Sequence, residues 1–221
     1  MTVFLLARHG ETDWNRERRW QGHADRPLTA RGRAQAVALA ERLADAQLDA
    51  IYASDLQRAR ETAAAVARSQ RLEVEIDPDL REVDVGSWSG LTRAEAEQRF
   101  PEAFARWQRG DVGWENGETY AEMCSRVLRC VERIAHRHPD GHVLLVTHAG
   151  PIRALHAAAL RVDVAAYRRM RPVEPNARLS AVCFVDGRVT ELCSAGRLDE
   201  LLAEDRRERA EAAAQPPTPA G

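Results

Sequence analysis

Lysine is absent from this chain of 221 residues, in which all 32 basic residues are arginine. Chemistry that depends on a lysine amine, such as Schiff-base catalysis, is therefore excluded. The chain also lacks a strong excess of either charge, because 34 acidic residues leave a net charge of −2. Without a strong global field, we expect neither a nucleic-acid partner nor a membrane partner.

The cysteines are few, and their spacing is not typical of a metal site. They form no C-x-x-C pair and have no neighbouring histidine at a zinc-ligand spacing. We therefore expect no metal and reduced, mostly buried thiols at Cys124, Cys130, Cys183 and Cys193.

Long hydrophobic runs are missing near the start of the chain. The apolar segment at residues 3–7 has no basic leader and is far too short for a signal peptide or a membrane span. We therefore expect a cytoplasmic protein.

Two short apolar runs predict buried strands that deliver polar residues at their carboxyl ends. Residues 2–7 lead into Arg8-His9-Gly10, and residues 143–147 lead into His148. Two further strands are predicted at residues 49–54 and 72–76. A hairpin at a sheet edge is predicted for residues 181–185 and 188–192, which Asp186-Gly187 separates.

Helices are predicted between these strands, because apolar residues recur at intervals of three and four over residues 29–43, 56–68 and 120–138. Strand and helix alternate, which predicts an α/β fold: a three-layer sandwich with a mostly parallel central sheet flanked by helices. Residues 87–117 favour a helical insertion near the site. We expect one domain over residues 1–196, followed by a charged helix and disordered tail over 197–221.

Polar residues should converge at one edge of this sheet. Ligands bind at the carboxyl ends of parallel strands, so Arg8, His9 and His148 would meet if their strands are neighbours. Arg58 lies in the first turn of a predicted helix, beside amide donors that favour an anion. Glu82 adds a carboxylate on a glycine-bounded loop. The pattern indicates a crevice for an anion.

These residues belong to an ordered series of motifs. Arg8-His9-Gly10-Glu11-Thr12, followed by Trp14-Asn15 and Gln21-Gly22, is similar to the signature of the histidine phosphatase (phosphoglycerate mutase-like) superfamily. The match continues in order over about residues 3–193 through Ser54-Asp55 with Arg58, Thr62, Leu80-Arg81-Glu82, Gly86-x-Trp88-x-Gly90, Gly117-Glu118 and Thr147-His148-Ala149-Gly150.

The resemblance implies a role for each residue at the predicted edge, without a metal or other cofactor. His9 would be the nucleophile that becomes phosphohistidine, and Glu82 the proton donor. The phosphoryl oxygens would be bound by Arg8, Arg58 and His148, which suits the planar, permanently charged fork of arginine. Binding of the remaining substrate would fall to Asn15, Gln21, Gly22 and Ala149.

The chemistry also predicts the state of His9. Its ring must be neutral to attack, and the neighbouring arginines oppose protonation. We therefore expect one ring nitrogen to attack while a backbone carbonyl holds the other and fixes the tautomer.

Three functions stay open on the sequence alone. The favoured one is a broad-specificity phosphatase acting on a small phosphorylated metabolite, because residues 90–117 lack the lysine, tyrosine and adjacent arginine pair of the related mutases. The alternatives are a cofactor-dependent phosphoglycerate mutase and a non-catalytic phospho-ligand binding protein. The predicted edge strands are also compatible with a homodimer.

Overall fold

The computed structural model describes residues 1–193 together with 198, 200 and 203. The helix and tail predicted for residues 197–221 therefore lie almost entirely outside the described residues. Within the described part, no helix is both long enough and apolar enough to cross a membrane.

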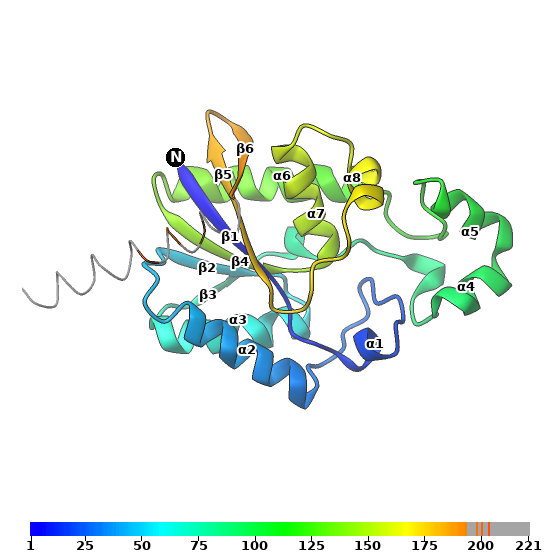
Figure 1. Ribbon diagram of the computed structural model, residues 1–221, viewed down its shortest axis with the longest axis horizontal. Helices are drawn as coiled ribbons and strands as arrows, with labels where there is room; N and C mark the ends of the chain where they lie inside the picture. The colour runs from blue at the N-terminus through cyan, green and yellow to red at the C-terminus, as the bar shows by residue number, and fades with distance from the viewer. Residues whose placement is uncertain (194–197, 199, 201–202, 204–221) are drawn as a thin grey trace, which may run out of the picture.

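Six strands form the central sheet of the described residues: β1 (Thr2–Arg8), β2 (Ala50–Ala53), β3 (Val74–Ile76), β4 (His142–Thr147), β5 (Leu179–Val185) and β6 (Arg188–Cys193). Their order is β3-β2-β4-β1-β5-β6 (Figure 1). The first four strands in this order are parallel, and the β5–β6 hairpin continues the sheet in antiparallel fashion. The predicted mostly parallel sheet and edge hairpin are therefore confirmed.

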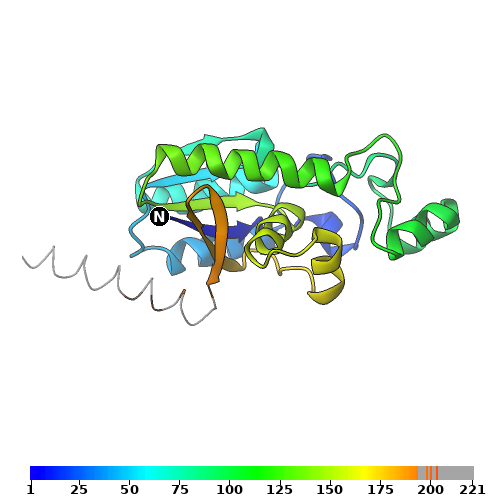
Figure 2. The same cartoon turned by 90° about the horizontal axis from the view of Figure 1, so that it is seen from above.

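Helices cover both faces of the sheet and complete the three-layer sandwich (Figures 1 and 2). One face carries α2 (Ala30–Arg42) and α3 (Gln57–Gln70), and the other carries α6 (Tyr120–Arg137) and α7 (Ala149–Ala159). The shorter elements are α1 (Asp13–Arg16), α4 (Arg93–Arg99), α5 (Pro101–Gln108), α8 (Val164–Met170) and the 3₁₀ turns η1 (Pro78–Leu80) and η2 (Gly86–Trp88).

Burial on both faces explains the continuous apolar run of β1. Successive side chains of a strand point to opposite faces. Val3 and Leu5 pack into the cluster that includes α2 and α3, whereas Phe4 and Leu6 pack into the cluster that includes α6 and α7. A strand covered on both faces reads as uninterrupted rather than alternating.

Helix α7 is not predicted by the sequence patterns, although it starts directly after His148. Gly150 and Pro151 read locally as a turn. Both residues lie in the first turn of α7, where a helix tolerates proline because the missing N–H would have no partner within the helix. The site strand β4 therefore leads straight into a helix N-terminus.

The predicted helical insertion is confirmed as α4 and α5, which extend away from the sheet (Figures 1 and 2). A cluster of tryptophans anchors it, with ring centroids 5.2–6.2 Å apart among Trp20, Trp88, Trp107 and Trp114. Aromatic pairs at this separation add to the stability that burial alone supplies.

Candidate active site

The parallel pairing of β1 with β4 brings two histidines together. Its register places Arg8 opposite Thr147, and the backbone N–H of His9 donates to the Thr147 carbonyl at 2.9 Å. The residue that directly follows each strand is then a histidine. The imidazole rings of His9 and His148 lie with centroids 5.0 Å apart, as the strand ends predict.

The hydrogen bonds of these rings define opposite tautomers. His9 donates from Nδ1 to the Gly10 carbonyl at 2.8 Å, so its Nε2 carries the lone pair. His148 accepts at Nδ1 from Nε of Arg58 at 3.2 Å, so its Nε2 carries the proton. That Nε2 is buried without a partner. The backbone carbonyl predicted to hold His9 is thus present, and the pair offers one nucleophilic nitrogen beside one donor.

Burial and neighbouring charge keep both rings neutral. Burial, with Arg58 and then Arg8, holds the pKa of His9 well below its usual value. Burial, with Arg58 and His9, does the same to the pKa of His148. Neutral imidazoles are what the tautomer assignment requires, and the unprotonated Nε2 of His9 is available for attack.

Arg58 is fixed in the first turn of α3 and is fully buried. Its guanidinium donates to the carbonyls of Gly22 at 2.8 Å and Ala24 at 2.7 Å. Gly22 adopts φ +49°, a left-handed conformation that favours glycine, and this turns its carbonyl toward Arg58. Burial lowers the pKa of Arg58 to about 10, so the group stays charged at neutral pH.

Thr62 links α3 to the loop after β1. Its hydroxyl accepts from the Gly10 N–H at 3.0 Å and donates to the Arg58 carbonyl at 2.7 Å. Arg8 emerges from the end of β1, where its Nη1 donates to the Glu174 carbonyl at 2.7 Å. Its Nε is buried without a partner. The site therefore holds cationic donors that an anion can satisfy.

Glu82 faces the same site from the loop after η1. Its Oε1 accepts the backbone N–H groups of Val83 at 2.9 Å and Gly150 at 3.0 Å. A Cβ at Gly150 would collide with this oxygen, so only glycine allows the carboxylate to reach the N-terminus of α7. Thr147 ties the loop to β4 by donating to the Leu80 carbonyl at 2.6 Å.

Arg126 holds the backbone of the Glu82 loop, although the sequence patterns do not single it out. It is paired with Glu118 at 2.6 Å and donates to the carbonyls of Asp79, Arg81 and Glu82 at 2.7–2.9 Å. Within the chain it is one of many arginines on a helix, so only the fold reveals its role. Arg126 fixes the place of Glu82 without facing the cavity.

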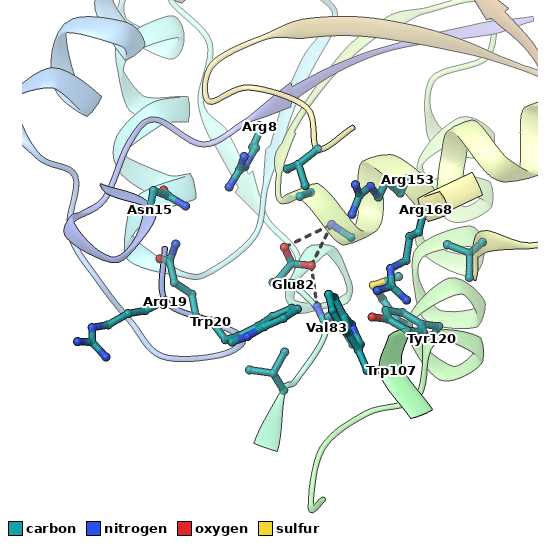
Figure 3. Close-up of a pocket in the computed structure, with 18 of the residues that line it drawn as sticks. Arg8, Asn15, Arg19, Trp20, Glu82, Val83, Trp107, Tyr120, Arg153 and Arg168 are labelled. Carbon is teal, nitrogen blue, oxygen red and sulfur yellow. Dashed lines mark hydrogen bonds between the residues drawn. The ribbon is translucent and has the colours of Figure 1, made fainter. Parts of the chain in front are cut away.

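A cavity of about 600 Å³ opens above these residues (Figure 3). His148 is fully buried and does not line it, but packs beside His9, which does. The residues that the sequence analysis assigned to the site and that line the cavity are Arg8, His9, Asn15, Gln21, Gly22, Arg58, Glu82 and Ala149.

Two amide side chains are oriented by Thr12 and Asn176. Asn15 accepts at Oδ1 from the Thr12 N–H at 3.0 Å and from Asn176 at 3.2 Å. Gln21 accepts at Oε1 from the Thr12 hydroxyl at 3.0 Å. Their oxygens are thereby occupied, which leaves the amide nitrogens as donors for an anion.

Trp88 and Trp114 pack around the aromatic wall of the cavity and do not form part of the wall itself. Both are buried behind the wall, whereas Trp14, Trp20 and Trp107 line the cavity. Packing decides this, because Trp88 fills the centre of the tryptophan cluster. Burial cannot be assigned to one tryptophan rather than another from local sequence.

The described residues contain no group of three or more His, Cys, Asp or Glu side chains that could hold a metal ion. Instead, the site brings together arginines, amide donors and one carboxylate with the Nε2 lone pair of His9 and the Nε2–H of His148. Such a set can bind a tetrahedral oxyanion, attack it in line and protonate a departing oxygen. The geometry is that of a phosphoryl-transfer site.

The profile of the histidine phosphatase superfamily (branch 1) matches residues 4–195. Phosphoserine phosphatase 1 of Hydrogenobacter thermophilus is 37% identical over 169 residues, or 76% of this chain and 80% of that protein. Glucosyl-3-phosphoglycerate phosphatase of Mycobacterium tuberculosis is 39% identical over 171 residues, or 73% and 76%.

A solved structure of Bacillus stearothermophilus YhfR has a TM-score of 0.81 and 34% sequence identity, and covers 89% of this chain and 97% of that one. The fold of this chain is therefore that of known phosphoglycerate mutase-like structures. The chain belongs to the histidine phosphatase superfamily.

The neutral histidine pair predicts acid-sensitive stability. Below about pH 6.5 the unfolded chain binds protons at His9 and His148 that the folded chain does not bind. The free energy of unfolding should therefore fall as pH falls, by up to about 1.4 kcal/mol per pH unit for each histidine. Above that pH the contribution is constant.

Urea unfolding between pH 5 and 6.5 measures the slope of the free energy of unfolding against pH. His148→Gln should reduce this slope by the contribution of one histidine, which is up to about 1.4 kcal/mol per pH unit. His136→Gln, at an exposed position of α6, is the matched control. An identical slope in the native chain and His148→Gln would contradict the neutral pair.

Proposed function

We propose that this chain is a metal-independent phosphatase that hydrolyses small phosphomonoesters through a phosphohistidine on His9. The observation that carries the proposal is the opposite tautomers of the two histidines. The Nε2 lone pair of His9 lies beside the unpartnered Nε2–H of His148, with Arg8 and Arg58 supplying positive charge. A binding site alone does not require a nucleophilic lone pair.

In the first step, the His9 Nε2 lone pair forms a bond to phosphorus while the bond from phosphorus to the alcohol oxygen breaks. Glu82, in its protonated form, gives its proton to the departing oxygen. Arg8, Arg58 and the Nε2–H of His148 donate to the phosphoryl oxygens, where negative charge spreads in the transition state. The products are an alcohol and phosphohistidine.

In the second step, water attacks the phosphohistidine from the position that the alcohol has left. The Glu82 carboxylate takes a proton from this water as the new oxygen–phosphorus bond forms. The bond between His9 Nε2 and phosphorus breaks, and its electron pair returns to the ring. Glu82 is protonated again, and phosphate leaves with His9 in its starting tautomer.

Hydrolysis is favoured over phosphoryl transfer to a second hydroxyl group of the substrate. Residues 90–117 carry no lysine to retain a bisphosphate. The relatives named as phosphatases of phosphoserine and of glucosyl-3-phosphoglycerate also support a hydrolase that acts on a small phosphorylated metabolite.

Three further features are proposed on sequence grounds. Residues 1–196 would form one domain, which the two clusters on opposite faces of one sheet support. A cytoplasmic location is also proposed, in keeping with the expectation of reduced thiols. A homodimer is supported by β3 and β6, which lie at the edges of the sheet.

The proposal predicts phosphate release from an aryl phosphate in excess chelator, with no bisphosphate added. His9→Ala should lower the rate by about 10³ or more, because no other residue carries the phosphoryl group. The exposed substitution His136→Ala serves as the control. Activity that persists in His9→Ala, or that chelator abolishes, would refute the proposal.

Arg126 should act on catalysis only by holding Glu82. Arg126→Met is expected to lower kcat by about 10² for an alkyl phosphate, whose poor leaving group needs the Glu82 proton. For an activated aryl phosphate the loss should be less than about tenfold. Glu82→Gln should show the same selectivity.

Arg133→Met is the matched control, because Arg133 also extends from α6 to acidic residues, but it pairs with the side chains of Asp77 and Asp79 and not with the backbone of Arg81 or Glu82. Steady-state kinetics on both substrates, with thermal unfolding to confirm folding, give the comparison. Equal losses on alkyl and aryl phosphates would show that Arg126 supports the fold rather than Glu82.

A further inference from the structure

Two arginines that the proposed mechanism does not use lie side by side in the cavity wall (Figure 3). They are Arg153 of α7 and Arg168 of α8. From this pair we infer a second anion subsite, which binds a carboxylate or another anionic group on the alcohol part of the substrate. The inference rests on the proposed function and adds a substrate class to it: phosphomonoesters with a second negatively charged group.

Neither arginine has its charge neutralised by the described residues. No described carboxylate lies within ion-pair distance of either, and Nη2 of Arg153 reaches only the Arg171 carbonyl at 3.3 Å. Nε of Arg153 and Nη1 of Arg168 are buried without a hydrogen-bond partner. Buried charged donors in folded proteins are normally paired. These two are therefore positioned for a partner from outside the chain.

The electrostatics of Arg153 and Arg168 also favour an anion as the partner of this pair. Burial lowers the pKa of Arg168, and the neighbouring Arg153 lowers it further. Burial also lowers the pKa of Arg153. The fold thus holds two cations where low polarity and mutual repulsion disfavour their charge. A bound anion would relieve both effects.

Stacking explains where Arg168 lies but not what it binds. Its guanidinium carbon lies 4.2 Å from the ring centroid of Tyr120 and 5.4 Å from that of Trp107. These contacts fix the guanidinium plane and leave the in-plane N–H groups free to donate. Nη1 remains unused, so the stack is a support for the subsite rather than an alternative to it.

Glu82 lies between Arg8 and Arg153 and interacts electrostatically with both (Figure 3). Its carboxylate is nevertheless held by the N–H groups of Val83 and Gly150. In the proposed mechanism Glu82 meets the departing oxygen, with the phosphoryl group on the Arg8 side. The alcohol part then extends toward Arg153 and Arg168, which is where its charged group would be bound.

A matched pair of compounds tests the subsite: 3-phosphoglycerate and glycerol phosphate, which differ by a carboxylate in place of a hydroxymethyl group. The native chain should prefer the carboxylate, with kcat/KM higher by about 10- to 100-fold, as expected for charge-assisted hydrogen bonds. The double variant Arg153→Gln with Arg168→Gln should lose this preference. Its kcat/KM for glycerol phosphate should change by less than about twofold, because neither arginine contacts the phosphoryl group.

A second pair, fructose bisphosphate and fructose 6-phosphate, identifies the anion. A preference for the bisphosphate that the double variant loses would support the subsite with a second phosphate as its ligand. Arg129→Gln, at an exposed position of α6, controls for the loss of positive charge. The single variant Arg153→Gln keeps the Arg168 stack and replaces the double variant if that does not fold.

Two results would overturn the subsite: no preference of the native chain for either charged compound, or equal losses on charged and neutral compounds in the variants. Failure of the proposed function looks different, because an aryl phosphate would not be hydrolysed either. If the aryl phosphate is not hydrolysed, calorimetric measurement of the binding of the same charged and neutral compounds tests the subsite on its own. Tighter binding of a charged compound that Arg153→Gln weakens would support the subsite, and equal binding would overturn it.

Discussion

The in-register parallel pairing of β1 and β4 is the constraint on which the site depends. It places His9 and His148 at neighbouring strand ends, and the β1 residue before His9 pairs with Thr147. A shift by one residue would turn every side chain of β1 to the opposite face. The helices α2 and α3 pack on one apolar face of the sheet, and α6 and α7 pack on the other. This packing fixes the register of β1 and therefore positions the site residues as well as the core.

Arg58 adds a fixed positive charge to the site that this strand pairing builds. It is fully buried, donates to two loop carbonyls, and sets the tautomer of His148. The result is a cavity floor with positive charge and unpaired donors. Such a site is unfavourable when empty and favourable around an oxyanion, which is how a fold can prepare for charge that develops in a transition state. The unpaired Arg153 and Arg168 extend the same principle toward the alcohol part of a substrate.

The sequence predicts the layers of the fold and the residues at strand ends, because apolar runs and their polar boundaries are local signals. These signals, together with the ordered motifs, predict His9, Arg58 and Glu82 as site residues. They do not predict Arg126, because its role arises only when α6 packs beside the Glu82 loop. Arg153 likewise lies on α7, whose Gly-Pro start reads as a turn. Residues that act by packing between distant elements have no local pattern.

The most direct test of the account is rapid quench of the native chain during turnover of a phosphomonoester, under alkaline conditions that preserve phosphohistidine, followed by peptide mass spectrometry. The account predicts one acid-labile phosphoryl group on His9, formed at least as fast as the enzyme turns over. Phosphate release with no phosphorylated peptide, or a phosphoryl group on a residue other than His9, would contradict it.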